Sequence, residues 1–253
     1  MNRGSGGEWI FGGHAVDEVL RARPATVKEV LIEHERRDPA LGEAARRAKA
    51  AGVRMRYVLR RELDRLSAGV SHQGLAARID LSAHRGLEDF LSGLAEKNDA
   101  VLLALDEIQD PHNLGAIARS ALNLGAAGLI VPERRTSSAG AAAMRASAGA
   151  LGKIERIEVT NLSRALEACR GKGFWIYGAD MGGRPAWDAT LNFPMVLVLG
   201  SEGRGLRPVI RGLCDEILSV PQAAAGVESL NVSCAASVLL YEIRRRVRTE
   251  RPA

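Results

Sequence analysis

The sequence predicts an α/β protein with a mostly parallel sheet in its larger C-terminal part and a smaller α/β module before it. From residue 87 onward, short apolar runs alternate with segments of helical apolar spacing, which is typical of strand–helix–strand units. Several runs, such as MVLVL at 195–199, are apolar at every position, as expected for strands buried on both faces. A chain of 253 residues is long enough for one large domain or two ordinary ones.

The first 80 residues have the pattern of a compact three-layer module. Their apolar spacing predicts helices at 14–22, 41–51 and 60–66 and strands at 27–32, 53–58 and 74–79. The polar stretch DLSAHRG that follows shows neither the apolar spacing of a helix nor the alternation of a strand. We therefore expect an N-terminal domain at 1–80, a linker at 81–86 and a second domain at 87–253.

The second domain carries the alternation that predicts the parallel sheet. Strands are expected at 100–105, 128–131, 155–159, 174–179, 195–199 and 216–220. Helices are expected at 87–97, 114–124, 139–150, 162–170 and 232–248. Ligands of such sheets bind beyond the carboxyl ends of the strands, so the functional site is expected there.

Charge and cysteine content restrict the environment and the partners of the protein. The net charge is +5, 30 of the 35 basic residues are arginine, and residues 1–83 hold 15 basic against 11 acidic side chains. Arginine binds phosphates well, which favours a nucleic-acid partner for the N-terminal part, although codon bias would give the same arginine excess. No apolar run could cross a membrane and no signal peptide is apparent, so we expect a cytoplasmic protein without a membrane partner. The three cysteines are scattered and the histidines lack ligand spacing, so we expect reduced thiols and no metal.

The segment LDEIQDPHNLGAIARSA carries the first candidate site residues. Pro111 is expected to fix a turn after a strand, and Asn113 to cap the helix that follows. Arg119 lies six positions after Asn113, so the two side chains are not stacked. Gly115 and Ala118 form a small face suited to close packing. These residues alone leave two interpretations. In the first, Asn113 only caps the helix and Arg119 forms a surface ion pair. In the second, both residues belong to a functional site.

Two further loops follow apolar strands, GSEGRG from Gly200 and SLNVS from Ser229. GSEGRG has neither the Lys-Ser/Thr pair of a P-loop nor the G-x-G-x-x-G spacing of a dinucleotide loop. Its acid, Glu202, either caps a short helix after the loop or places a carboxylate in a pocket. Either Ser229 or Asn231 is expected to cap the long C-terminal helix, and capping explains the presence of only one of these two residues. Because glycine lets backbone groups approach a ligand closely, the two loops are expected to be walls of one small-molecule pocket.

Together these segments resemble the SpoU family, also called TrmH, of RNA 2′-O-ribose methyltransferases. The matching motifs are NLGAIARSA at 113–121, LVLGSEGRGL at 197–206 and VP…ESLNVS at 220–233. The front module resembles the family's optional RNA-binding domain of the ribosomal L30e fold, through IFGGHAVDEVL at 10–20 and HQGLAARI at 72–79. The resemblance is closest to the branch that methylates a guanosine of 23S ribosomal RNA.

The resemblance implies a sheet threaded through a trefoil knot (the SPOUT fold), a homodimer and S-adenosyl-L-methionine as methyl donor. It maps the cofactor contacts onto Leu199, Gly200, Val220 and Leu230. It maps the polar catalytic set onto Asn113, Arg119, Glu202, Ser229 and Asn231. The expected activity is methyl transfer to the ribose 2′-OH of a 23S rRNA guanosine. The alternatives are a tRNA guanosine 2′-O-methyltransferase and a non-catalytic RNA-binding dimer on the same fold.

Two points modify what the resemblance implies. Pro221 is followed by Gln222 and three alanines, so this loop is one residue longer than the family pattern and the adenosine side of the pocket is expected to differ. The resemblance also makes Arg119 the base or its organiser. Because a guanidinium keeps its proton at neutral pH, we expect Arg119 rather to anchor a phosphate and stabilise the developing alkoxide, while Glu202 and Asn231 orient the reacting groups.

Overall fold

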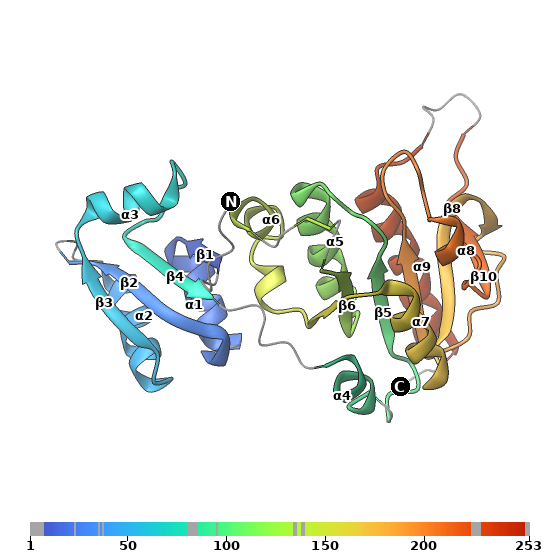
Figure 1. The fold of residues 1–253 in the computed structure, drawn as a ribbon, viewed down its shortest axis with the longest axis horizontal. Coiled ribbons are helices and arrows are strands. Elements are labelled where there is room, and N and C mark those ends of the chain that lie inside the picture. The colour runs from blue at the N-terminus through green and yellow to red at the C-terminus, as the bar shows by residue number, and fades with distance from the viewer. Residues whose placement is uncertain are drawn as a thin grey trace.

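The structure, a computed structural model, contains two β-sheets that are each covered by helices on both faces and lie side by side in Figure 1. It describes residues 8–22, 24–34, 36, 38–79, 86–94, 96–133, 136–137, 140–223 and 229–250. The expected linker at 81–86 lies outside the described residues except for Gly86. Residues 224–228 of the lengthened loop also lie outside them.

The smaller sheet has four strands in the order β1-β4-β2-β3. Its strands are β1 (Glu8–Phe11), β2 (Val27–Glu33), β3 (Arg54–Val58) and β4 (Leu75–Ile79), with helices α1 (Gly13–Ala22), η1 (Pro24–Thr26), α2 (Pro39–Ala50) and α3 (Arg60–Ser67). β2 and β3 pair in parallel, whereas β4 pairs antiparallel with both β1 and β2. Val16 of α1 and Ala44 of α2 share a core with Val30, and Leu63 of α3 joins Leu31 in a core on the other face. These are the three layers that the sequence predicts.

The larger sheet has six strands in the order β10-β8-β9-β5-β6-β7, all parallel. Its strands are β5 (Val101–Leu105), β6 (Gly128–Pro132), β7 (Arg156–Val159), β8 (Trp175–Pro185), β9 (Met195–Leu199) and β10 (Glu216–Ser219). Its helices are α4 (Leu87–Ser92), α5 (Pro111–Asn123), α6 (Ala141–Ala146), η2 (Ala150–Gly152), α7 (Leu162–Gly171), α8 (Pro208–Arg211) and α9 (Val232–Glu250). The predicted α/β class with a parallel sheet is confirmed.

Alternate residues of the central strands divide the core of the larger sheet into two layers. Leu103 of β5 packs in the layer that includes α5 and α9, whereas its neighbour Leu102 packs in the layer that includes α4, α7 and α8. Every residue of β5 and β9 is buried. Burial on both faces explains why these two strands are continuously apolar in sequence, and it places their carboxyl ends between the two helical layers.

The sequence prediction missed β1 and misplaced the ends of several other elements; α6, for example, spans Ala141–Ala146 instead of 139–150. β1 was not expected, because four residues are too few to show alternation, and it depends on long-range pairing with β4. α4 ends at Ser92 instead of residue 97. β8 continues to Pro185, although the adjacent glycines Gly182 and Gly183 suggest a turn. A Cβ atom on Gly183 would lie 2.5 Å from the carbonyl oxygen of Ile217, so glycine there lets β10 approach where its register shifts.

Candidate functional site

A cleft of about 610 Å³ opens at the carboxyl ends of β9 and β10. Its walls are the loop after β9, the loop after β10, and the start of α9 with the residues before it. Asp180 and Met181 of β8 also line it. The sequence predicts a pocket with these two loops as its walls, at this edge of the sheet, and the structure brings them together there.

Two glycines shape the loop after β9. Backbone hydrogen bonds between Ser201 and Gly205 close it into a tight turn, with N–O distances of 3.1 and 3.0 Å. A Cβ atom on Gly200 would lie 2.2 Å from the carbonyl carbon of Gly205, so a larger residue does not fit at this crossing. Gly205 has a φ of +64°, which favours glycine. The turn presents Glu202 at its tip, on the cleft.

Asp106 anchors the end of this loop. Its fully buried carboxylate, directly after β5, accepts hydrogen bonds from the backbone N–H of Arg207 at 2.9 Å and from Nε of the same arginine at 2.6 Å. Removing one partner of a buried, hydrogen-bonded charge pair is strongly destabilising. Neither residue stood out in the sequence. The sequence offered one signal for this ion pair, since Asp106 directly follows a continuously apolar strand. A carboxylate buried at such a place needs a cation as its partner.

Glu202 and two asparagines form a hydrogen-bonded chain at the edge of the cleft. Asn113 Nδ2 donates to Glu202 Oε1, and Asn231 Nδ2 donates to Asn113 Oδ1 at 3.0 Å. Asn231 Oδ1 in turn accepts hydrogen bonds from the backbone N–H of Ser233 at 2.8 Å and from its hydroxyl at 2.6 Å. Asn113 is buried, whereas Glu202 is exposed. The side-chain amides of Asn113 and Asn231 are therefore each held in one orientation. Asn231 fixes the amide of Asn113, and Asn113 in turn holds the carboxylate of Glu202.

The expectation that Asn113 caps α5 is wrong. Asp110 is the N-cap and accepts a hydrogen bond from the backbone N–H of His112 at 2.8 Å. Pro111 is the first residue of the helix rather than part of a preceding turn. Asn113 thus lies inside the first turn, where its side chain is free to bond to other elements.

The remaining capping alternatives are resolved by α8 and α9. Glu202 does not cap α8, because the N-cap there is Arg207 and no side chain makes a capping bond. Asn231 immediately precedes α9 and accepts the hydrogen bond from Ser233 N–H, so Asn231 caps this helix. Ser229 is exposed on the wall of the cleft.

Arg119 does not join the other candidate residues. It is exposed on α5 and does not line the cleft. Its guanidinium makes no hydrogen bond or ion pair with any residue that the structure describes. Six positions along a helix turn it to a different face from Asn113, whose side chain meets Glu202 and Asn231.

The residues that the resemblance assigns to the cofactor all line the cleft: Leu199, Gly200, Val220 and Leu230. Leu218 and Leu239 add apolar surface. The charged side chains of Asp180, Glu202 and Arg204 also border it. The trefoil knot that the resemblance implies at this place remains a prediction, as does the effect of the lengthened loop.

The three cysteines are free, as expected. Burial raises the pKa of Cys169 to about 12 and that of Cys214 to about 11, so both are protonated and unreactive at neutral pH. Among the described residues, three or more His, Cys, Asp or Glu side chains do not gather as a metal site would require. Over the same residues, the structure has no helix with the length and apolar character of a membrane span.

Two family models match the chain. Residues 100–241 match the SpoU rRNA Methylase family, and residues 9–84 match the model described as RNA 2′-O ribose methyltransferase substrate binding. A protein of Mycobacterium ulcerans, named an uncharacterized tRNA/rRNA methyltransferase, is 41% identical over 244 residues, which cover 96% of this chain and 78% of the relative.

Solved structures agree with these matches. The SpoU methyltransferase AviRb of Streptomyces viridochromogenes, in complex with the cofactor AdoMet, has a TM-score of 0.79 and 25% identity, covering 98% of this chain and 95% of AviRb. The TrmH/SpoU tRNA modifying enzyme of A. aeolicus has a TM-score of 0.53 and 26% identity, covering 65% of this chain and 85% of its own. The chain therefore belongs to the SpoU family of RNA methyltransferases.

Proposed function

We propose that this protein transfers a methyl group from S-adenosyl-L-methionine to the ribose 2′-OH of a guanosine in 23S ribosomal RNA. The observation that carries the proposal is the hydrogen-bonded chain of Asn231, Asn113 and Glu202 at the edge of a cleft built from the family motifs. The match of residues 9–84 to a 2′-O ribose methyltransferase substrate-binding model supports the ribose hydroxyl as acceptor.

The cleft suits S-adenosylmethionine in size and in chemistry. Its volume of about 610 Å³ lies within the roughly 300–1,000 Å³ of small-molecule sites. Leu199, Val220 and Leu230 offer apolar surface for the adenosine. When bound, the cofactor supplies a methyl group that its sulfonium has already activated.

The protein's own residues have to place the ribose 2′-OH in line with that methyl group and accept its proton. Glu202 is the carboxylate at the cleft that orients the hydroxyl, and Asn113 and Asn231 hold Glu202 in place. Ser229 is exposed on the same wall, where we expect its hydroxyl to contact the substrate. Arg119 holds a substrate phosphate and stabilises the developing alkoxide, because its guanidinium keeps its proton at neutral pH.

This role for Arg119 requires a second copy of the chain, because Arg119 does not line the cleft of its own chain. α5 lies beside α9, and the hydroxyls of Ser120 and Ser237 are 2.7 Å apart between them. α9 exposes two large apolar side chains, Val238 and Tyr241. Apolar surface next to the helix of Arg119 supports a homodimer in which each Arg119 serves the partner's cleft.

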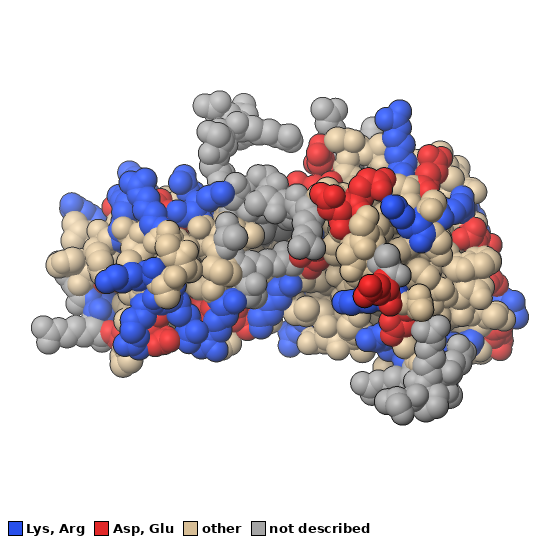
Figure 2. Space-filling view, turned by 90° about the horizontal axis from the view of Figure 1, so that it is seen from below, with Lys and Arg blue, Asp and Glu red and all other residues tan. Residues whose placement is uncertain are grey.

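The N-terminal part is the proposed RNA-binding domain, residues 1–80. Figure 2 shows Lys and Arg side chains gathered over it, whereas acidic and basic side chains are interspersed over the C-terminal part. Exposed arginines of β3 and α3 also belong to this part of the chain, namely Arg54, Arg56, Arg60, Arg61 and Arg65. The A. aeolicus tRNA modifying enzyme matches only 65% of this chain, which supports rRNA over tRNA as the substrate of a protein with the additional N-terminal sheet.

Methyl transfer from tritiated S-adenosylmethionine to 23S rRNA and to total tRNA, each isolated from a deletion strain, tests the proposal. We expect label in 23S rRNA, mapped to a guanosine 2′-O position. Label in tRNA would move the protein to the alternative substrate. The absence of label in any RNA, despite measurable binding of rRNA, would leave the non-catalytic RNA-binding dimer.

A further inference from the structure

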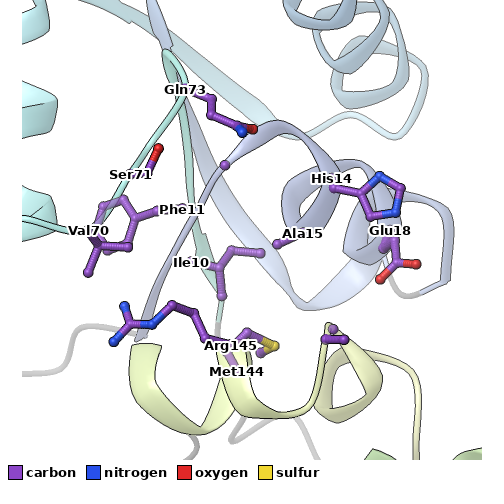
Figure 3. Close-up of a pocket in the computed structure, with 13 residues that line it drawn as sticks. Ile10, Phe11, His14, Ala15, Glu18, Val70, Ser71, Gln73, Met144 and Arg145 are labelled. Atoms are coloured by element: carbon purple, nitrogen blue, oxygen red, sulfur yellow. The ribbon is translucent and has the colours of Figure 1, made fainter.

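A second cavity, of about 250 Å³, lies between the N-terminal sheet and the segment that contains α6. We call it the joint groove; Figure 3 shows the residues that line it. Phe11, His14 and Gln73 line it from the N-terminal side, and Met144 and Arg145 from α6. It shares no lining residue with the cleft described above.

Close contacts beside the joint groove fix its shape. Lys153 Nζ and Glu18 Oε1 form an ion pair at 2.7 Å across the joint. A Cβ atom on Gly152 would lie 2.7 Å from Cγ2 of Val19, and one on Gly149 would lie 2.2 Å from Oε2 of Glu18. Glycine at these two positions lets α1 lie directly against the segment after α6. The two walls are therefore held together by packing as well as by charge.

The joint groove offers apolar surface, two rings and unused polar groups. In Figure 3, Gln73 lies at one end of the groove, His14 at one side and Arg145 across the other. Gln73 Oε1 accepts a hydrogen bond from Gly13 N–H at 3.1 Å, and its amide N–H groups have no acceptor among the residues that the structure describes. Arg145 is exposed and makes no side-chain hydrogen bond or ion pair with the described residues.

We infer that the joint groove holds one unpaired base of the RNA substrate, with a neighbouring phosphate on Arg145. A volume of about 250 Å³ is below the roughly 300–1,000 Å³ of drug-sized ligand sites, which favours a single planar base over a whole cofactor. Proteins recognise single-stranded RNA by stacking bases on aromatic, His or Arg side chains and by hydrogen bonds to base edges. The two rings lie on opposite sides of the groove in Figure 3, and the exposed imidazole of His14 provides the stacking surface, with Gln73 as the amide.

The position of the groove also favours RNA. One wall belongs to the segment that matches a substrate-binding model, at 9–84, and the other to the segment that matches the methylase, at 100–241. An RNA strand that contacts both segments passes this joint. The only carboxylate that lines the groove, within the described residues, is that of Glu18, and it is already paired with Lys153. The inference rests on the proposed function, because it assumes an RNA substrate.

Two variants of the full chain test the groove separately for shape and for charge. Ala15→Phe fills the groove from α1 without a change of charge, and Arg145→Glu reverses the charge at its edge. Arg164→Glu, on the exposed surface of α7, is the matched charge control. We expect the Kd for transcribed 23S rRNA to rise about tenfold in both groove variants and less than about twofold in the control, since base stacking and phosphate contacts each contribute on this scale.

The outcomes separate this inference from the proposed function. Binding of S-adenosylmethionine and the melting temperature should match the wild type in all three variants. If the wild type methylates rRNA but Ala15→Phe binds it normally, the base-binding groove is wrong, even when Arg145→Glu binds weakly. If the wild type labels no RNA with tritiated S-adenosylmethionine, the proposed function is wrong. With 4-thiouridine-substituted rRNA, we expect cross-links to the peptides of Phe11 or His14 that disappear in Ala15→Phe.

Discussion

Glu202 is held by side chains on two other elements rather than by its own loop. Asn113 comes from α5 and Asn231 from the residue before α9, and both are joined to Glu202 through one line of hydrogen bonds. The buried amide of Asn113 is the central member, since its nitrogen and its oxygen are both used. A hydrogen bond to a charged group contributes about 1.5–3 kcal/mol, so the identity of this one side chain matters.

We expect Asn113→Asp to reduce methyl transfer by about 10- to 150-fold, the kinetic equivalent of losing one hydrogen bond to a charged group. The variant replaces the donating amide by a carboxylate oxygen that faces the carboxylate of Glu202. Asn123→Asp, an exposed position on the same helix, is the control. Initial rates with saturating S-adenosylmethionine provide the measurement. Equal rates for the two variants would show that the chain of hydrogen bonds has no part in the reaction.

Arg119→Lys tests the role of the guanidinium. Lysine keeps the charge but loses the planar pair of donors that binds phosphate in two places. We expect the variant to lose most methyl transfer while its Kd for S-adenosylmethionine stays unchanged, because the proposed partners of Arg119 are the RNA phosphate and the developing alkoxide rather than the cofactor. Tritium transfer and calorimetry measure the two quantities. Full activity would remove Arg119 from the reaction.

The sequence predicted which residues form the site better than it predicted the hydrogen bonds between them. The motifs named the residues, and the glycines of the loop after β9 marked the tight turn that presents Glu202. The bonds of Asn113 were not predictable, because its partners lie 89 and 118 positions away in sequence. Local rules therefore made it a helix cap, which is the strongest short-range preference of an asparagine before a helix. Asp110, three positions earlier, satisfies that preference instead.

Among the elements, α5 and α6 pack so closely that a glycine is required. A Cβ atom on Gly115 of α5 would lie 2.4 Å from the carbonyl oxygen of Ala143 and 2.6 Å from Cβ of Ala146. This close approach is the small-residue packing expected from Gly115 and Ala118. It positions α6, which carries Arg145 and one wall of the joint groove.

Gly115→Ala and Gly42→Ala are a matched pair of helix-interior substitutions with opposite expected signs. Alanine is preferred over glycine in a helix by about 1 kcal/mol. Gly42 of α2 has open space around its Cβ position, so Gly42→Ala should stabilise the protein by up to about that amount. Overpacking at Gly115 should outweigh the preference and lower the free energy of unfolding by about 1–3 kcal/mol. Urea unfolding measures both, and stabilisation by both variants would contradict the packing.

The C-terminal part of α9 is fixed by a cluster of charges. Hydrogen bonds from Arg245 and then Arg246 hold the pKa of Glu242 well below its ordinary range, at about 2, against the opposing effect of burial. Arg246 also donates to the carbonyl oxygens of Ala186, Trp187 and Ala189. Glu242 therefore orients the arginine that ties α9 to the segment between β8 and β9.

This cluster predicts a pH dependence. A carboxyl whose folded pKa is lowered stabilises the protein above its unfolded pKa, about 4.3 for glutamate, and loses that contribution as the pH falls towards 2. At pH 7, Glu242→Gln should lower the free energy of unfolding by about 1 kcal/mol or less, since the group is partly screened by water. The difference from the wild type should shrink between pH 4 and pH 2. Glu167→Gln, exposed on α7, is the control, and a difference that does not depend on pH would contradict the assignment.

The helices and strands that are most buried were the easiest to predict from the sequence. The continuous apolar runs of β5 and β9 and the periodic helices α5, α7 and α9 were found in the sequence with small errors at their ends. β8 was cut short at its glycines, because the sequence does not reveal that β10 lies against Gly183. β1 was missed since only its pairing with β4 makes it a strand.

At the scale of the whole molecule, the placement of Arg119 predicts that two chains share each site. Arg119→Ala and Glu202→Ala should each be inactive alone. Co-expressed with different tags, they should recover about a quarter of the wild-type activity, because half of the dimers are mixed and each mixed dimer has one complete site. Light scattering should give twice the chain mass of 27.1 kDa. Inactive mixed dimers of the correct mass would show that Arg119 does not act across the interface.

The order of the strands has a consequence for how the protein is made. β9 lies between β8 and β5, and α9 packs beside α5 through Ser237 and Ser120, 117 positions apart. Such distant pairings form slowly, because a long stretch of chain must be closed before they contribute. On the ribosome, the N-terminal sheet has all its strands by residue 79, whereas Asn231 is synthesised much later. A nascent chain can therefore present the proposed RNA-binding surface well before it can assemble the proposed active site.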